Sequence, residues 1–552
     1  MNPRILFIAS CIALVTSAFT FSVRGEILQD MGNAYQLTQT QKGDLEGAVF
    51  LGMAASMVVG GFICDMLGMK LIMIIACLCH LAGVAGTIWA PHNEWSYAIL
   101  WTAAFVMGCG NGMVETGINP LAASLYPDKK THIMNILHAW WPGGLILGGL
   151  AVLYLRKGID LGFVEIAGLD LKYGEYANWQ VSLFLILIPS IIYGLIVLTQ
   201  KFPETERVAA GISYGEMFKE AFRPLFLVLA FAMLLTAATE LGPQKWQASV
   251  MQRTAMVSGT LILVYTSGMM FVLRHFAGAL VHRTSPIMLL LVSSVLSAVG
   301  LYLLSTATTA TTAFTYATIF GLGIAFFWPT MLGITAERFP KGGALLLCLM
   351  GSFGNLAISQ VLPIMGKIYD KNGVAKLQEQ DSALAASVIR KDAIDQTLTG
   401  QINLLTPPSA EDVQKASQAD TTKLLEEVRQ NALTPVQREQ LAKWLRDHGS
   451  PTAADKLPRL NTSEPPTLST REVKALRDGL LELKPTLTAG QQDVLRKKEA
   501  IDTAEAHGAS QTFQQVSVLP LILIFIFGGI YLYDRSRGGY KVETIQGGTG
   551  GH

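Results

Sequence analysis

The sequence predicts an all-α integral membrane protein, with twelve transmembrane helices in two six-helix halves and a helical soluble insert. Its mean hydropathy is +0.38. Hydrophobic residues make up 51% of its 552 residues and charged residues only 15%, well below the roughly 25% of an ordinary soluble domain. The third observation is a series of twelve long, mostly apolar runs. The net charge of +1 does not indicate a nucleic-acid partner.

The apolar runs have the length that a helix needs to cross a bilayer, about 20 residues. They cover residues 5–24, 45–64, 71–90, 97–124, 134–155, 179–199, 224–242, 256–281, 286–305, 312–335, 343–368 and 515–533. No clear small-residue cleavage site follows the first run, so we interpret it as a retained helix rather than a signal peptide. The six cysteines lie in apolar runs, without the spacing of a metal site or a disulfide framework.

The distribution of basic residues predicts the orientation. Lys and Arg are concentrated in the inner loops if both termini are cytoplasmic. A polar linker, residues 201–223, separates a first half, residues 1–200, from helices seven to eleven, residues 224–369. Residues 515–552 supply the twelfth helix and a cytoplasmic tail. Similar short motifs follow the second and eighth spans, and repeated halves around a central pathway are typical of secondary transporters.

Residues 370–514 break this pattern, because they are polar and rich in Ala, Gln and charged residues. On the predicted orientation they form an extracytoplasmic insert. Thr434, Ser469 and Thr488 each precede an amphipathic stretch and predict helix N-caps. We expect a small helical domain with a disordered stretch near residues 448–467.

The fourth and fifth runs carry the most unusual polar residues. Asn111, Glu115 and Asn119 are spaced i, i+4, i+8, which places them on one face of a helix, and Asn135 and His138 follow on the fifth run. An ionisable group inside a membrane span is costly unless it faces a cavity or a partner. Glu115 is therefore the leading candidate for a functional residue. A structural hydrogen bond between helices is the alternative.

The loop after the second span resembles a known motif. It carries a glycine at position 61, then Asp65, Gly68 and Lys70. With the two-half layout, this pattern resembles the major facilitator superfamily. The resemblance implies a cytoplasmic gate in which Asp65, Gly68 and Lys70 latch two helix ends, although Met66 replaces the usual Arg or Lys after the acid. A helix cap in a positively charged inner loop is the simpler alternative.

A second motif narrows the resemblance. Glu115-Thr-Gly-Ile-Asn119-Pro is similar to Glu-Thr-Ala-Ala-Asn-Pro, the signature of the fucose permease group of sugar–proton symporters. At the end of span one, Gly-Glu26-Ile-Leu is similar to the Asn-Asp-Ile-Leu of that group. The resemblance covers nearly all of the chain except 370–514, and it implies proton coupling by Glu115 and Glu26. An ion pair in the headgroup region is the alternative for Glu26.

Sugars are bound by oriented polar groups and a flat aromatic wall. The candidate substrate-binding residues are Asn119, Asn135, His138, Trp141, Gln244, Asn355 and Gln360. Because adjacent helical residues point about 100° apart, only one of Trp140 and Trp141 is expected to face a cavity. Pro329 predicts a bend in the tenth span, and Arg274 needs a carboxylate or a cavity if it is buried. Packing between helices is the alternative for the amides.

Together these features predict a secondary active transporter that imports a monosaccharide, a hexose or deoxyhexose, by proton symport with alternating access. The sequence contains no phosphate-binding loop of the kind that would indicate ATP-driven transport. It also contains no nucleophile–base pair or set of metal ligands that would indicate an enzyme. We expect a functional monomer in the lipid bilayer of the inner or plasma membrane, with the proton as coupling ion and no cofactor. The alternatives are proton-coupled efflux of small hydrophobic compounds and a membrane sensor that uses the insert as its ligand module.

Overall fold

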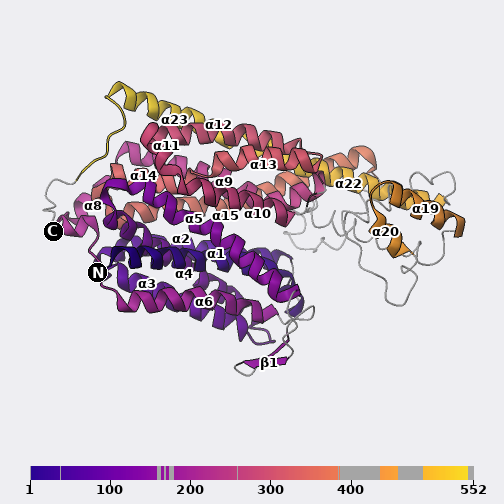
Figure 1. Ribbon diagram of the computed structural model, residues 1–552, viewed down its shortest axis with the longest axis horizontal. Helices are drawn as coiled ribbons and strands as arrows, with labels where there is room; N and C mark the ends of the chain where they lie inside the picture. Colours follow the sequence, from indigo (N-terminus) through magenta and orange to yellow (C-terminus); the bar gives the residue numbers. More distant parts are fainter. Residues whose placement is uncertain are drawn as a thin grey trace, which may run out of the picture.

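The computed structural model describes residues 2–35, 37, 39–157, 163–166, 169–172, 179–255, 257, 259–382, 385, 435–457 and 489–544. Most of this chain forms a bundle of long helices that run side by side (Figure 1). Helix α1 (Pro3–Ala34) starts at one end of the bundle, and α23 (Val518–Ser536) brings the chain back to that end. We call it the termini end. The opposite end, from which α22 (Ala489–Val516) extends, is the insert end.

The first half consists of α1 and five further helices. They are α2 (Gln39–Leu67), α3 (Met69–Ile88), α4 (Ser96–Leu125), α5 (Lys130–Lys157) and α6 (Trp179–Thr199), with a short turn of helix, η1 (Pro127–Lys129), before α5. Helix α4 packs against α2 and α3, and α1 packs against α5 and α6. Glycines allow the close approach of α4 to α2, because a Cβ atom at Gly108 or Gly112 would collide with the backbone of Val49 or Met53.

The second half follows a linker with two short helices, α7 (Glu206–Ala209) and α8 (Tyr214–Ala221), of which α8 is amphipathic and starts with a Ser213–Glu216 capping box. The half contains α9 (Pro224–Thr254), α10 (Gly259–His275), α11 (Ala277–Arg283), α12 (Pro286–Ser305), α13 (Ala310–Ile324), α14 (Phe327–Arg338), η2 (Pro340–Gly342) and α15 (Gly343–Gln380). Helix α23 packs against α12 and α9 and completes it. The two halves meet where α2 lies against α15 and where α5 lies against α10 and α14.

Each of the twelve predicted spans overlaps at least one helix of the described chain. Ten helical segments in these ranges are long and apolar enough to cross a membrane, and the other two predicted spans coincide with α5 and with α10 and α11. The tenth span is interrupted between α13 and α14, at the bend predicted from Pro329. Large apolar side chains remain exposed on the bundle, including Phe525 at 81%, as expected for a surface that contacts lipid.

The ends of the predicted insert continue membrane helices. Helix α15 runs on to Gln380, and α22 packs along it before α23 begins. Helix α19 (Pro435–Asp447) starts directly after the predicted cap Thr434, and α22 starts directly after Thr488, whereas Ser469 lies outside the described residues. Helix α20 (Pro451–Lys456) lies within the stretch that we predicted to be disordered, so that prediction was wrong for these residues.

A β-hairpin is a departure from the all-α prediction. Strand β1 (Phe163–Ile166) pairs antiparallel with β2 (Leu169–Lys172) between α5 and α6, so that Val164 faces Leu171. The prediction rested on long apolar runs, and strands of four residues are too short to appear in such a search.

Candidate functional site

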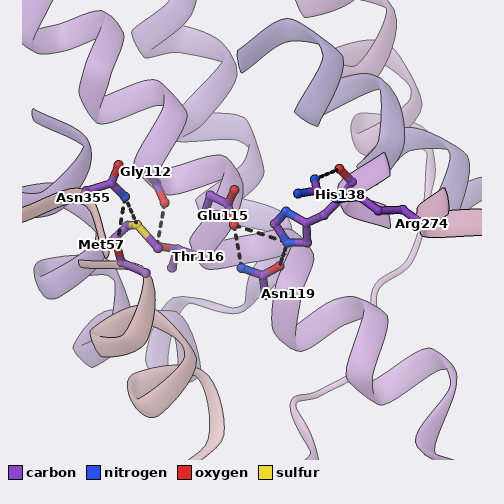
Figure 2. A network of polar contacts seen from close by, with 9 residues as sticks. Met57, Gly112, Glu115, Thr116, Asn119, His138, Arg274 and Asn355 are labelled. Atoms are coloured by element: carbon purple, nitrogen blue, oxygen red, sulfur yellow. Dashed lines mark hydrogen bonds and ion pairs between the residues drawn. The ribbon is translucent and has the colours of Figure 1, made fainter. Parts of the chain in front are cut away.

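Glu115 lies within α4, enclosed by helices, with 2% of its surface exposed. One turn further on the same face, the side-chain amide of Asn119 donates a hydrogen bond to Oε2 of Glu115 over 2.7 Å. From α5, Nε2 of His138 lies 3.0 Å from Oδ1 of Asn119 and 3.7 Å from Oε2 of Glu115. The three side chains converge between the helices (Figure 2). The structure thus brings together three of the residues singled out from the sequence.

The hydrogen-bond directions in this cluster follow from the amide. Because Nδ2 of Asn119 can only donate, Oδ1 is the atom that accepts, and Nε2 of His138 supplies the hydrogen. This assignment from the network fits a neutral imidazole with its hydrogen on Nε2. Oε2 of Glu115 therefore accepts the hydrogen bond from the amide of Asn119. None of the described residues hydrogen-bonds to Oε1, which leaves that oxygen for a proton or a ligand.

Asn111 belongs to a different polar chain. Its Oδ1 lies 2.9 Å from Nε2 of His80 on α3, and its Nδ2 donates to Thr20 on α1 over 2.9 Å. Nδ1 of His80 lies 3.2 Å from the hydroxyl group of Tyr193 on α6. All four residues are buried, so this chain ties four helices of the first half together and has a structural role.

The second half contributes a buried ion pair. Glu240 of α9 is 2% exposed and Arg274 of α10 is 1% exposed, and Nη2 of Arg274 donates to Oε1 of Glu240 over 2.9 Å. The backbone N–H of Trp328 donates to Oε2 of Glu240 over 3.4 Å. A buried Arg274 was expected to need a carboxylate, and Glu240 is that carboxylate.

Both carboxylates line a narrow cavity between the halves, together with His138 and Arg274. The remaining lining residues are Phe21, Phe50, Met53, Trp141, Leu241, Trp328, Asn355 and Ile358. Its volume is about 30 Å³, which is room for about one water molecule. A solute can reach Glu115 only after the helices around this inner cavity move apart.

A larger cavity of about 190 Å³, which we call the outer cavity, lies toward the insert end. It shares Phe21, Phe50, Trp141, Leu241 and Ile358 with the inner cavity, so the two are adjacent parts of one pathway. The polar residues on its walls are Ser22, Glu26, Gln244, Lys245 and Ser267. The rest of the wall is apolar, and the ammonium group of Lys245 lies over the ring of Phe21 at 5.3 Å.

Other candidates from the sequence also line the pathway. Trp141 lines both cavities, whereas Trp140 packs edge-on against Phe271, so only one of the two tryptophans faces the cavity. Gln244 lines the outer cavity, where its amide lies 2.9 Å from the sulfur of Met270.

Asn355 lines the inner cavity, and its amide donates to the carbonyl group of Gly351 over 2.9 Å. Glu26 lines the outer cavity, and the neighbouring Arg24 pairs with Glu46 at 3.1 Å instead. Glu26 and Glu115 therefore stand at different levels of one pathway.

Three candidates do not line either cavity. Asn119 donates to Glu115 and lies beside His138 but is not itself a lining residue. Asn135 donates to the carbonyl group of Thr131 and to the hydroxyl group of Thr330, over 2.9 and 3.2 Å, and so joins α5 to α14. Gln360 is exposed, with its amide 3.4 Å from Ser359. Gln360 follows Asn355 by five positions along the helix, which turns its side chain about 140° away from that of Asn355. We therefore leave Gln360 out of the candidate binding site.

The predicted gate uses a different cation. Asp65 pairs with Nε of Arg207 at 2.5 Å and accepts from the hydroxyl group of Thr205 over 2.6 Å. Lys70 donates instead to the carbonyl groups of Leu198 and Gln200 at the end of α6, over 2.9 and 3.0 Å. Asp65 and Lys70 therefore do not form the predicted latch with each other, because Lys70, in the first turn of α3 after Gly68 (φ +79°), reaches the end of α6.

Further contacts close the termini end between the halves. Nζ of Lys130 pairs with Glu206 at 2.6 Å and donates to the carbonyl group of Ala336 over 3.3 Å. The backbone N–H of Thr131 donates to Oε1 of Glu337 over 3.0 Å. The pathway is therefore closed toward the termini end, while its larger cavity lies toward the insert end.

Glu240, Arg274 and Arg207 matter to this geometry but were not in the proposed set of site residues, although a buried Arg274 was expected to need a carboxylate. Their signal was present, since an ionisable residue in a span needs a partner, but the sequence does not say which acid meets which base. Among the described residues, no group of three His, Cys, Asp or Glu side chains is placed to hold a metal ion.

Comparison with known proteins identifies the family and the fold. A family model described as Major Facilitator Superfamily matches residues 5–362, a range that ends before the insert. No curated protein matches the chain significantly.

Solved structures with the same fold include three transporters. FucP, the E. coli fucose:proton symporter, is similar in its outward conformation, with 17% identity, a TM-score of 0.54, and coverage of 66% of this chain and 92% of FucP. The proton:xylose symporter XylE has 14% identity, a TM-score of 0.54, and coverage of 66% and 89%. The human organic anion transporter MFSD10 has 12% identity, a TM-score of 0.52, and coverage of 67% and 94%. At these identities the similarity shows the fold.

Proposed function

Since this chain belongs to the major facilitator superfamily, we propose that it imports a monosaccharide, a hexose or deoxyhexose, together with a proton by alternating access. The family and the fold are those of transporters rather than enzymes. We assign the termini end to the cytoplasm, because the basic loop residues lie there. The larger cavity then faces the outside of the inner or plasma membrane, as import requires. We propose that a monomer is the functional unit.

The observation that carries the proposal is the setting of Glu115. Among the described residues, no Lys or Arg pairs with this buried carboxyl group, and its nearest polar neighbours are an amide and an imidazole. A carboxyl group next to neutral donors can adopt both its protonated and its charged form, whereas a guanidinium partner would keep it charged. Glu115 is therefore the residue that we propose to bind and release the coupling proton. Glu26, in the outer cavity, stands on its path from outside.

The proposed cycle follows from the two cavities. A proton and a sugar enter from the insert end, and protonation of Glu115 removes the charge that disfavours closing the inner cavity around a solute. The halves then rock, and the contacts of Asp65 with Arg207 and of Lys130 with Glu206 open at the termini end. Release of the proton to the cytoplasm returns Glu115 to its charged form.

The walls of the pathway support a sugar as the solute. Trp141 presents a flat ring to both cavities, and the amides of Gln244 and Asn355 with the imidazole of His138 supply donors and acceptors for hydroxyl groups. Asn119 acts through Glu115 and His138, which it orients. Asn135 joins α5 to α14, and we propose that it shapes the site through this contact.

Proton-coupled efflux of small hydrophobic compounds is the second candidate function. It is favoured by one observation, the apolar character of most of the outer cavity, which includes Leu145, Ile146 and Leu263. Such a wall suits an apolar compound at least as well as it suits the apolar face of a sugar ring. The two candidates differ in direction, because efflux couples inward proton movement to outward movement of the compound.

The test is proton movement across energised cells or proteoliposomes when members of a panel of sugars are added. The proposal predicts that one sugar makes the external medium more alkaline in wild type, and that Glu115→Gln abolishes this response. Glu94→Gln, which changes an exposed carboxylate in a loop, is the matched control and keeps the response. If no sugar in the panel gives a response, with the protein folded and inserted, symport of a sugar is rejected and efflux is favoured.

A further inference from the structure

Two prolines leave backbone carbonyl groups free at the interface of the halves. Pro142 lies inside α5 and has no N–H to donate to the carbonyl group of His138, four residues earlier. Pro329 lies in the first turn of α14 and cannot donate to the carbonyl group of Ala325. A buried carbonyl group without a partner is costly, so each of these oxygens needs another donor.

Arg274 supplies both donors. Its Nη1 donates to the carbonyl oxygen of His138 over 2.7 Å, and its Nε donates to that of Ala325 over 2.6 Å. The third nitrogen, Nη2, donates to Glu240, so each guanidinium nitrogen has one acceptor. Figure 2 shows Arg274 reaching the backbone of His138. The fixed fork of the guanidinium group suits such a set of three acceptors better than an ammonium group would.

The three bonds do not hold the same part of the molecule. Glu240 and Ala325 belong to the second half, so two bonds fix Arg274 to the half that contains its own helix. His138 belongs to α5 of the first half. Only the bond to His138 among these three crosses between the halves, and it sits where α5 lies against α10 and α14.

We propose that Arg274 links the two halves through the carbonyl groups that Pro142 and Pro329 leave free, and that its one bond across the interface, to His138, breaks when the termini end opens. Arg274 is in this view a positioning residue that moves with the second half. The inference rests on the alternating access proposed above but not on the identity of the solute.

His138 gives this bond a connection to Glu115. Its imidazole contacts Asn119 and lies beside Glu115, while its carbonyl oxygen accepts from Arg274. A shift of α5 that follows a change at Glu115 therefore changes the bond to Arg274 as well. A guanidinium that only stabilised the second half would be insensitive to such a shift.

The prolines provide a test that leaves Arg274 in place. Pro142→Ala restores an N–H that competes for the carbonyl group of His138, and so weakens the link between the halves. Pro329→Ala does the same for Ala325, but that bond lies within the second half, and this variant is the matched control. Each change is combined with Ser22→Cys, on the wall of the outer cavity, or with Ala123→Cys, on a small cavity at the termini end.

The measurement is the rate at which a membrane-impermeant maleimide labels each added cysteine, without any solute, after subtraction of the rate for the parent protein. We expect Pro142→Ala to slow labelling of Ser22→Cys in cells about tenfold and to speed labelling of Ala123→Cys in inside-out vesicles by a similar factor, the change that loss of one hydrogen bond to a charged group produces. Pro329→Ala should change both rates less than threefold. Because no sugar is present, the outcome of this labelling experiment does not depend on whether the protein transports a sugar.

Equal labelling in Pro142→Ala and wild type would overturn the proposal, and so would equal changes in the two proline variants. Arg274→Lys is the second variant, since it keeps the charge beside Glu240 but cannot reach all three acceptors. It should shift labelling in the same direction as Pro142→Ala, with a melting temperature that shows a folded protein. Labelling of a folded Arg274→Lys variant like that of wild type would also overturn the link.

Discussion

Glu115 and Glu240 are two buried carboxyl groups on opposite sides of one cavity, and their partners differ. Glu115, in the first half, accepts from the neutral amide of Asn119, whereas Glu240, in the second half, pairs with the guanidinium of Arg274. The amide tolerates both forms of its carboxyl group, while the ion pair favours the charged form. The first half therefore holds a carboxyl group that can change its charge. The second half holds a fixed ion pair whose arginine also donates to backbone carbonyl groups.

The largest effect on transport is expected when Glu115 loses its ability to carry charge. Glu115→Gln keeps the size of the side chain and its hydrogen bond with Asn119, so the protein should fold normally. Accumulation of the solute against its gradient should fall to the background level, while exchange of labelled for unlabelled solute continues. Uptake and exchange in proteoliposomes measure the two activities, and full accumulation by the variant would contradict the assignment.

On the other side of the cavity, the main effect expected from a substitution is on stability rather than on transport. Removing one member of a buried ion pair leaves an uncompensated charge, which typically costs about 3–5 kcal/mol, so Arg274→Met should lower the melting temperature sharply. The double variant Arg274→Met with Glu240→Gln should recover much of this loss because neither charge remains. Thermal unfolding in detergent gives all three values. A single variant as stable as wild type would show that the pair is not buried as described.

The gate allows a comparison of two cations near one acid. Arg207→Ala removes the partner of Asp65, while Lys70→Ala removes only contacts with the end of α6. We expect Arg207→Ala to speed labelling of Ala123→Cys from the termini side about tenfold, and Lys70→Ala to change it about twofold. The reverse order would restore Lys70 as the latch.

A smaller effect is expected from the aromatic wall. Trp141→Ala should raise the KM for the transported sugar about three- to tenfold with little change in kcat, because the ring contributes about 0.5–1.5 kcal/mol beyond its buried area. Trp140→Ala is the control, since Trp140 packs against Phe271 away from the cavities. Similar KM values in the two variants would remove the tryptophan wall from the proposed site.

The smallest effect is expected at the tail. Glu543 pairs with Arg223 at 2.7 Å, but the two side chains are 47% and 35% exposed, and exposed pairs contribute about 1 kcal/mol or less. Glu543→Ala should therefore leave transport unchanged and lower the melting temperature only slightly. A loss comparable with that of Arg274→Met would show that the tail matters to the closed termini end.

The sequence predicted the helices and the first-half cluster because both depend on local pattern. A bilayer requires about 20 apolar residues per span, and a helix places Glu115 and Asn119 one turn apart whatever surrounds them. The partner of Glu240 depends on how α9, α10 and α14 pack, which no local pattern specifies. The same holds for Arg207 at Asp65 and for Gln360, whose direction follows from the rotation of α15 within the bundle.

The prolines illustrate the limit most clearly. Pro142 and Pro329 can be recognised in the sequence as sites that free a carbonyl group, but their positions are almost two hundred residues apart. That one guanidinium meets both oxygens is a property of the packed halves. A sequence pattern can therefore predict that a donor is needed, and only the fold identifies it.

The most direct test of the central claim is infrared difference spectroscopy of the purified protein, recorded between acidic and alkaline pH, in the region of the protonated carboxyl group. Wild type, Glu115→Gln, and the double variant Glu240→Gln with Arg274→Met are compared. If Glu115 binds the coupling proton and Glu240 remains charged, one buried carboxyl band should appear with acid in wild type and in the double variant and be absent from Glu115→Gln. A band that persists in Glu115→Gln and disappears from the double variant would contradict the account and move the coupling site to the second half.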